Sequence, residues 1–289
     1  MKQYHLPMQN VKKSNAICRA YWTPLNVYEP RIIALLASQI QPTDEDFKEY
    51  EIPFTALFTE KEYGGKDYIK LQKSLKSLVE KSITIKEDDG RIKIYPLFYS
   101  AEINPNSNSF KIAIHDKLKH HFIDLKQHYT QYNLLEFLTL SSTYSQRLFE
   151  YLKSWEDCES TQIAVEELHK ILGVPEEYKK NFFNFKRRAL VPALTEIMKK
   201  TGLEYVWEVK KQGRKITHII FINSKPKAKT PDWLKKKIQK AQDIQNENQE
   251  EQRPSAHQQP EQANFSDLIK QLEEEKKRLV EESKKNKNK

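Results

Sequence analysis

The fold of this chain is decided by the stretch YKKNFFNFKRRALVPALTEIMKK (residues 178–200) and by the two stretches after it, LEYVWEVK (203–210) and RKITHIIFI (214–222). Apolar residues recur every three or four positions in the first stretch, which predicts a helix with one buried face: they are Tyr178, Phe182, Phe185, Ala189, Ala193 and Ile197. Pro192 removes a backbone donor, so a kink is expected near residues 188–191. The two later stretches flank Gly213 and predict a β-hairpin.

The first half of the chain repeats this order. Residues 66–81, KDYIKLQKSLKSLVEK, place Tyr68, Leu71, Leu75 and Leu78 on one helical face, and the opposite face carries Lys66, Lys70, Lys73 and Ser77. Residues 83–86 and 91–95 then flank Asp89–Gly90, a strong hairpin signal. Upstream we expect a buried helix over residues 30–41 and a short strand entering a short helix over 52–58. The matching elements of the second half are helices over 132–153 and 164–172.

Each half therefore has a helix, a short helix, a basic helix and a hairpin. This order is typical of a winged helix, in which the second helix of a helix-turn-helix enters the major groove and a β wing follows. The predicted fold class is α+β, with an N-terminal winged helix (residues 1–127) and a C-terminal one (128–224). Residues 225–289 are polar and charged, so we expect a largely disordered tail with a partly helical end.

The composition excludes several function classes. The chain has 289 residues, of which 6 are Gly and 2 are Cys, and its formal net charge is +9. Scattered glycines leave no phosphate-binding loop, and two cysteines leave no disulfide framework or cysteine-rich zinc site. No apolar run has the length of a membrane span or a signal peptide. We therefore expect a cytoplasmic protein that is not an enzyme, has no cofactor and has no membrane partner.

Positive charge is concentrated on the second basic helix and its hairpin. Residues 176–215 hold 11 Lys and Arg against 5 Asp and Glu, and no acidic residue occurs between Glu177 and Glu196. Such a helix face suits phosphates, and Arg and Asn side chains can also read base edges. The DNA-binding residues predicted here, in addition to the four on the first basic helix, are Lys179, Lys180, Asn181, Asn184, Lys186, Arg187, Arg188, Lys210, Lys211, Arg214 and Lys215.

Two other kinds of site are weighed against DNA binding. Four histidines are near one another in sequence (His115, His120, His121 and His128), but they lack the spacing of a metal motif, so no metal is expected. Tyr129 and Tyr132 could serve a nicking initiator of rolling-circle replication. Such enzymes, however, hold a metal with two His separated by one apolar residue, and this triplet is absent from the sequence. We expect these tyrosines to pack between the two domains instead.

Several ordered motifs resemble one family. VKKSNAICRA (residues 11–20), HYTQYNLLEFLTLSSTYSQRLFEYLKSW (128–155), VEELHKILGVPEEYKKNFFNFKRRALVPALTEI (165–197) and EVKKQGRKITHIIFI (208–222) resemble elements of the iteron-plasmid replication initiators, the Rep_3 or RepB-like family of theta-type plasmids. The resemblance covers about residues 8–223. It implies a bacterial, plasmid-encoded tandem winged-helix initiator whose recognition helices are residues 178–191 and 67–81.

The resemblance also implies partners. Members of this family bind iterons at the plasmid origin as monomers, help to open it, and recruit the host replication initiator and the replicative helicase. As dimers they commonly bind an operator inverted repeat and repress their own gene, with dimer contacts from the N-terminal winged helix. Two alternatives stay open from the residues alone: a transcriptional repressor without a replication role, and the rolling-circle nicking initiator.

Overall fold

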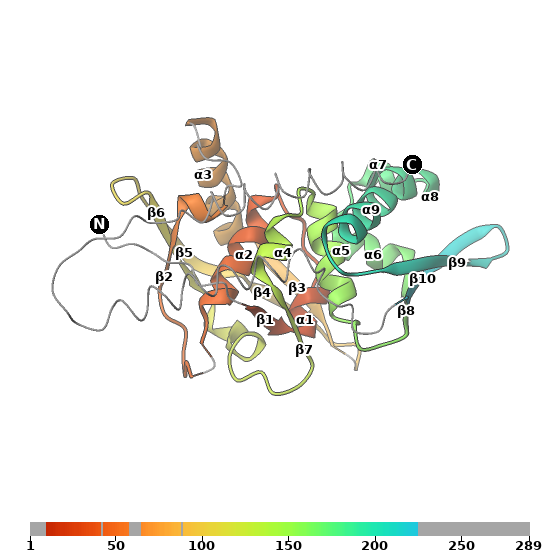
Figure 1. Cartoon of the computed structure of the whole chain (residues 1–289), viewed down its shortest axis with the longest axis horizontal. Helices are drawn as coiled ribbons and strands as arrows, with labels where there is room; N and C mark the ends of the chain where they lie inside the picture. The colour runs from red at the N-terminus through yellow and green to blue at the C-terminus, as the bar shows by residue number, and fades with distance from the viewer. Residues whose placement is uncertain (1–9, 42, 58–64, 88, 225–289) are drawn as a thin grey trace, which may run out of the picture.

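The computed structural model describes residues 10–41, 43–57, 65–87 and 89–224, so the predicted tail lies outside the described residues. Figure 1 shows the elements of the first half. They are β1 (Asn10–Ser14), α1 (Asn15–Arg19), α2 (Tyr28–Gln39), β2 (Tyr50–Pro53), the 3₁₀ helix Phe54–Leu57, α3 (Gly65–Glu80), β3 (Ser82–Lys86), β4 (Ile92–Pro96), β5 (Phe98–Asn104), β6 (Ser109–Ile114) and the 3₁₀ helix Asp116–His121.

The second half begins with a strand and then becomes mainly helical until its wing. Its elements are β7 (Tyr129–Asn133), α4 (Leu134–Leu138), α5 (Thr143–Lys153), β8 (Ser160–Ala164), α6 (Val165–Leu172), α7 (Glu176–Lys179), α8 (Phe182–Phe185), the π-helical turn Lys186–Leu190, α9 (Val191–Lys200), β9 (Tyr205–Gln212) and β10 (Lys215–Asn223). The order helix, short helix, basic helix and hairpin is thus present in both halves, and the predicted α+β class is confirmed.

The strands of the described residues form four small antiparallel sheets. Each predicted hairpin is present: β3 pairs with β4 in one half, and β9 pairs with β10 in the other. Gly90 and Gly213 have φ values of +86° and +60° at the two tips, a backbone conformation that glycine adopts without strain. A strand that the sequence did not indicate, β8, pairs with β10 and makes the second wing three-stranded.

The core is continuous through both halves. In α3 the predicted stripe is confirmed, since Leu71, Leu75 and Leu78 are buried and Tyr68 packs against the core. The apolar stripe of the second basic helix behaves in the same way, because Phe185, Ala189 and the later members are buried. In both halves burial of one face therefore leaves the polar face of the basic helix outside.

The helix predicted over residues 132–153 is wrong in part. Tyr132 belongs to β7, and the helical region is divided into α4 and α5. Two side-chain caps explain the division: Asn133 accepts hydrogen bonds from the amides of Leu135 and Glu136, and Ser142 accepts one from the amide of Tyr144. Each cap satisfies amides that have no partner at a helix start, so each begins a new helix.

The long helix predicted over residues 178–200 is also interrupted. The expected irregularity before Pro192 is present as the π-helical turn, in which the Val191 amide donates to the Lys186 carbonyl. A second interruption was not expected from the sequence. Asn181 has extended backbone angles, and its side-chain oxygen accepts from the Phe183 amide at 2.7 Å, so it begins α8 as a cap.

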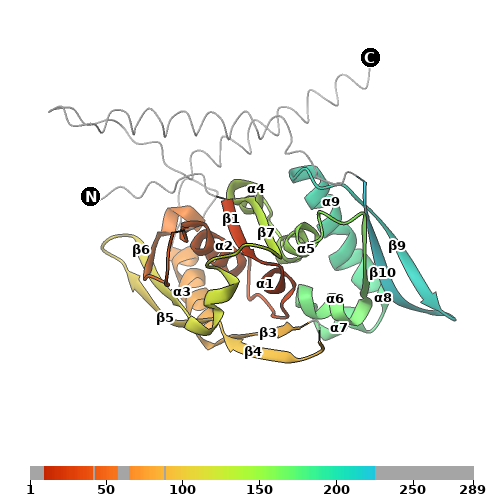
Figure 2. The ribbon, with the colours of Figure 1, turned by 90° about the horizontal axis from the view of Figure 1, so that it is seen from below.

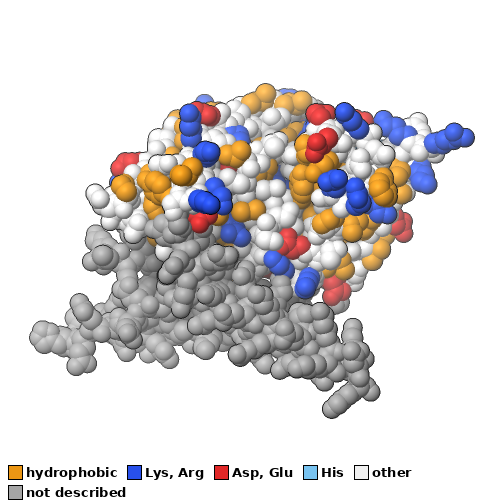
Figure 3. All heavy atoms as spheres, turned by 90° about the horizontal axis from the view of Figure 1, so that it is seen from above, with side chains coloured by type: hydrophobic (Ala, Val, Ile, Leu, Met, Phe, Trp, Pro, Cys, Tyr) orange, Lys and Arg blue, Asp and Glu red, His pale blue; other side chains and the backbone are white. Residues whose placement is uncertain are grey.

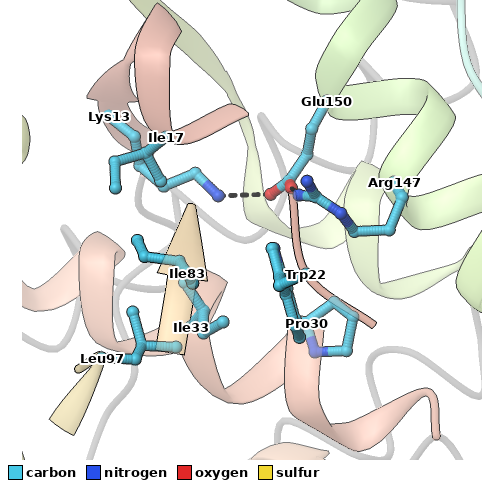
Figure 4. A pocket seen from close by; sticks show the side chains of 9 residues that line it. All are labelled: Lys13, Ile17, Trp22, Pro30, Ile33, Ile83, Leu97, Arg147 and Glu150. Atoms are coloured by element: carbon cyan, nitrogen blue, oxygen red, sulfur yellow. Dashed lines mark hydrogen bonds and ion pairs between the residues drawn. The ribbon is translucent and has the colours of Figure 1, made fainter. Parts of the chain in front are cut away.

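The N-terminal strand is anchored to the centre of the chain. β1 pairs with β7, and Lys13 on β1 forms a buried ion pair with Glu150 on α5 (Figure 4). The second oxygen of this carboxylate accepts from Arg147 at 2.7 Å, and Tyr132 donates to the first at 2.7 Å. Burial alone would raise the pKa of the Glu150 carboxyl, but the Lys13 and Arg147 cations hold it below its ordinary value.

Further contacts join α6 to the N-terminal half. The Glu167 carboxylate accepts from the Tyr21 hydroxyl at 2.6 Å and lies 3.4 Å from the Lys86 ammonium on β3. Figure 2 shows β3 and β4 extending toward α6. None of the helices in the described ranges is both long and apolar enough to cross a membrane. The division at residues 127 and 128 stays a prediction.

Candidate nucleic-acid interface

The second basic segment runs from α7 to α9 and is held by its apolar residues. Phe185 is fully buried, and the ring of His169 on α6 packs against it with a centroid distance of 4.4 Å. Burial, together with the nearby Lys179 cation, lowers the pKa of His169 to about 4, so the imidazole is neutral near pH 7. The inner face of this segment therefore packs against an uncharged imidazole, and its cations face outward.

The predicted cations of this segment lie on the surface, and several contact aromatic rings. Lys180, Lys186, Arg187 and Arg188 are exposed, whereas Lys179 is half-buried and lies 2.5 Å from the Glu176 carboxylate. The charged groups of Lys186, Arg187 and Arg188 lie 5.3, 5.8 and 5.5 Å from the ring centroids of Trp207, Phe183 and Tyr178. These contacts fix the stems of the cations without neutralising their charge.

The two asparagines have different surroundings. Asn181 is exposed, but one lone pair of its side-chain oxygen is used in the cap of α8, so its amide nitrogen and the second lone pair are left for another partner. Asn184 is half-buried on α8. The sequence suggested both as readers of base edges, and the cap gives Asn181 a structural role that the sequence pattern did not indicate.

A surface groove lies between α8 and the second wing. It has a volume of about 560 Å³ and is lined by Asn181, Phe182, Phe183, Lys186, Trp207, Glu208, Val209, Lys211 and Ile216. Its wall is thus largely apolar, with Lys186 of the π-helical turn on one side and Glu208 and Lys211 of β9 on the other. This groove brings the predicted residues Asn181, Lys186 and Lys211 together.

The tip of the second wing carries the remaining predicted cations. Lys210, Lys211, Arg214 and Lys215 are all exposed around the turn at Gly213. Lys215 is 3.5 Å from the Glu166 carboxylate of α6, and both side chains are largely exposed. An exposed pair of this kind contributes little to stability, so the lysine can exchange its partner for a phosphate at low cost.

The first basic helix, α3, carries a similar but weaker surface. Lys66, Lys70 and Lys73 are exposed, and Ser77 is half-buried. Lys70 lies 3.3 Å from Asp67, and Lys73 and Ser77 line a shallow hollow of about 390 Å³. The helix therefore presents its predicted polar face to solvent.

The two basic helices reach the same side of the molecule. α3 and the α7–α8 region both lie along the upper side of Figure 1. Figure 3, which views this side from above, shows Lys and Arg side chains in separate groups over the two halves. One duplex could therefore be approached by both basic helices from a single face.

Some residues at this surface were not predicted from the sequence. Lys76 is exposed on α3, three residues after Lys73, and helical spacing alone could have placed it on the same face. Trp207 and Phe183 line the groove beside the cations. The sequence gives no signal for these two, because an aromatic residue in an apolar pattern is usually assigned to the core.

The alternative sites have the following geometry. Tyr132 is 3 % exposed and donates a hydrogen bond to Glu150, whereas Tyr129 is 38 % exposed with the Lys12 ammonium 4.1 Å from its ring centroid. Only Tyr132 is therefore buried, and packing of the two tyrosines between the domains stays a prediction. His121 is buried and its Nδ1 lies 2.8 Å from the Ser14 hydroxyl oxygen. In the described residues, no three His, Cys, Asp or Glu side chains group as metal ligands.

Two family models match the chain, one after the other along the sequence. Residues 10–153 match the model described as "Initiator Replication protein, WH1", and residues 164–223 match "Initiator Rep protein, WH2". The chain belongs to this family of replication initiators. The family resemblance and the two winged helices predicted from the sequence are thereby confirmed. This initiator family is a family of DNA-binding proteins without enzymatic activity, as expected from the sequence.

Two individual proteins are similar to this chain. A "Probable replication protein rep" of Bifidobacterium longum (strain NCC 2705) is 24 % identical over 118 residues, which are 41 % of this chain and 40 % of that protein. A crystal structure of the Pi initiator protein in complex with iteron DNA superposes with a TM-score of 0.58 at 19 % identity. That alignment covers 76 % of this chain and 99 % of the other, and it supports the tandem winged-helix fold.

Proposed function

We propose that this initiator binds repeated double-stranded DNA sites, the iterons of a plasmid origin, through both winged helices. The observation that carries the proposal is the exposed run Lys186, Arg187 and Arg188 on the second recognition segment, where no acidic residue occurs between Glu177 and Glu196. The Pi protein, which shares the fold, was crystallised with iteron DNA. In this proposal residues 178–191 and α3 enter major grooves, and the second wing contacts the flanking backbone.

Binding of this kind has a clear electrostatic basis. Cations that neutralise phosphates release condensed counterions, so the logarithm of the affinity falls by about 0.9 per phosphate for each unit of log salt. The fifteen predicted residues are the proposed contacts to DNA, and those whose side chains are exposed can reach a duplex without rearrangement of the core. Opening of the origin would then draw on binding and DNA bending together with the motors of the host.

The proposal is tested with the full chain and duplexes from the DNA beside its gene. A repeat duplex should bind more tightly than a scrambled duplex of the same composition. Arg187→Ala should cost about 1–3 kcal/mol and relax specificity at one base position if this side chain reads a base. Lys126→Ala, a change at an exposed lysine outside both basic helices, should have no effect. Equal affinity for repeat and scrambled duplexes would exclude the proposal.

Self-association belongs to the same proposal. We infer that a dimer binds an operator inverted repeat and represses the gene, and that the first winged helix supplies dimer contacts. Ile92 and Ile94 on β4 are exposed, and among the described residues the outer edge of this strand has no strand partner. An exposed apolar edge strand is a natural site for pairing with another chain. Ile94→Lys should shift sedimentation toward the monomer, and unchanged sedimentation would contradict this placement.

Initiation is distinguished from repression alone by a replication assay in a bacterial host. We propose that the protein acts in the cytoplasm at its own plasmid, where it recruits the host replication initiator and the replicative helicase. A plasmid that carries only the repeats should replicate when the protein is supplied from a second plasmid. If it represses its promoter but supports no replication, the repressor alternative replaces the initiator. A covalent adduct of Tyr129 with nicked origin DNA would favour the rolling-circle alternative.

A further inference from the structure

Phe183 is an apolar side chain in a strongly cationic surrounding. It is 62 % exposed, whereas its neighbours Phe182 and Phe185 pack against or into the core. Lys186 and Arg187 are exposed beside it, and the guanidinium of Arg187 lies 5.8 Å from its ring centroid. Figure 3 shows hydrophobic side chains next to cations on the side of α7–α9. Since this ring is not packed in the core, we expect it to contact a ligand that has an apolar group beside a negative charge.

The first basic helix contains the same arrangement. Ile69 is 51 % exposed on α3, on the side away from the buried Leu71 and Leu75. Lys73 follows it by four residues, and Arg187 follows Phe183 by four residues, so in each helix a cation neighbours the apolar side chain. Each recognition helix therefore presents an apolar group next to a cation.

DNA offers one apolar group at the edge of its bases in the major groove. This group is the C5-methyl of thymine, and apolar side chains contact it directly. The phosphates beside it provide the negative charge that the neighbouring cations match. The combination of apolar group and cation thus fits a thymine-containing step in a duplex.

We propose that Phe183 and Ile69 are specificity-determining residues, each of which contacts a thymine methyl in the major groove. This inference rests on the proposed function, because both side chains must enter a groove. Phe183 also lines the groove between α8 and the second wing, where Trp207 and Ile216 continue its apolar wall. The sites recognised by the two halves should therefore each contain at least one thymine at a fixed position.

The test replaces thymine by deoxyuridine, which removes the methyl and keeps every hydrogen-bonding group of the base. Fluorescence anisotropy with the full chain should show the repeat duplex binding about fourfold more weakly for each recognised thymine that is replaced. This factor corresponds to the free energy of burying one methyl or methylene group. Phe183→Ala should bind the two duplexes with equal affinity at the position that it reads. Phe183→Leu should retain part of the discrimination, and Ile69→Ala should affect a different thymine.

Matched controls separate this contact from general effects of the base change. Met198→Ala and Val206→Ala remove exposed apolar side chains of the same half, and both should keep the full discrimination. Circular dichroism melting checks that each variant is folded. If the wild-type chain binds thymine and deoxyuridine duplexes equally, the inference is wrong even though a preference for repeat over scrambled duplex stands. If Phe183→Ala keeps the discrimination, the assignment to Phe183 is wrong.

Discussion

Lys13 and Glu150 form an ion pair in the interior, although 137 residues separate them in the chain. Their side chains are 1 % and 2 % exposed, and Arg147 and Tyr132 complete the hydrogen bonds of the carboxylate. A buried charge is tolerated only when its partners are in place. The pair therefore makes β1 an integral part of the structure.

Replacement of Glu150 by Gln should strongly destabilise the protein. The change leaves Lys13 and Arg147 as buried cations without a counter-charge, a loss of about 3–5 kcal/mol in the free energy of unfolding. Urea denaturation at pH 7 measures it. The matched control is Asp124→Asn, which makes the same chemical change in an exposed pair with Lys126 and should alter stability by less than about 0.5 kcal/mol. Equal losses of unfolding free energy in the two variants would show that the buried pair contributes no more to stability than the exposed one.

Gly173 should be far less replaceable than Gly213, although their φ values of +62° and +60° are nearly the same. A Cβ at Gly173 would meet the Cα of Thr23 at 2.8 Å, whereas nothing lies within 4 Å of one at Gly213. Gly213→Ala should cost about 1 kcal/mol through backbone strain alone. Gly173→Ala should cost about 1–3 kcal/mol more, because the backbone of Thr23 has to move. Thermal melts of both variants give the comparison.

Glu196 should make stability depend on pH in the acid range. Burial raises the pKa of this carboxyl, but the Lys200 ammonium and hydrogen bonds from the hydroxyl and amide of Ser141 outweigh burial and lower it to about 2. A lowered pKa contributes stability above the unfolded value of 4.5, which is lost as the pH falls toward 2. Glu196→Gln should therefore cost up to about 3 kcal/mol at pH 7, and the difference should shrink by more than about 1 kcal/mol at pH 3.5.

The control for this pH dependence is the exposed Glu80, whose pair with Lys76 spans 3.8 Å on α3. Glu80→Gln should change stability by less than about 0.5 kcal/mol at both pH values. Urea titrations of the two variants and the wild type at pH 7 and pH 3.5 supply all six values. A Glu196→Gln difference that grows on acidification would contradict the predicted sign.

Arg214 should act through phosphates. Its position at the exposed tip of the second wing suits the DNA backbone and not a base edge. Arg214→Ala should weaken binding by a similar factor for repeat and scrambled duplexes, and it should lower the slope of log affinity against log salt by about 0.9. Arg187→Ala is the contrasting variant if Arg187 reads a base. A loss for the repeat duplex alone would assign Arg214 to base recognition instead.

The sequence predicted those elements in which the buried residues recur at one regular spacing. The steps of three and four through Leu71, Leu75 and Leu78 indicated α3, and the Asp89–Gly90 turn indicated the first wing. The interruptions in the helices were harder to predict from the sequence. They occur where a capping side chain begins a new helix, at Asn133, Ser142 and Asn181. A capping side chain is visible in the sequence, but its use depends on the backbone around it.

The interface could be predicted only as a set of charges. Cations without interspersed acids indicated the surface of α7–α9, and the structure shows that these side chains are exposed or half-buried. The aromatic wall of the groove, to which Phe183 and Trp207 belong, could not be predicted. Whether an aromatic residue faces the core or the solvent depends on the packing of α8 against the wing, which periodicity does not describe.

The pairing of β1 with β7 has a consequence for the way in which the chain is made. During synthesis the first strand leaves the ribosome early, but Ser14 pairs with Tyr129, so β1 stays without its partner until the whole N-terminal half and β7 have been translated. Closing so long a loop is slow compared with forming a local helix. The surroundings of Lys13 are therefore completed only after α5 has emerged, and we expect a truncated product that ends before Glu150 to be sensitive to proteases.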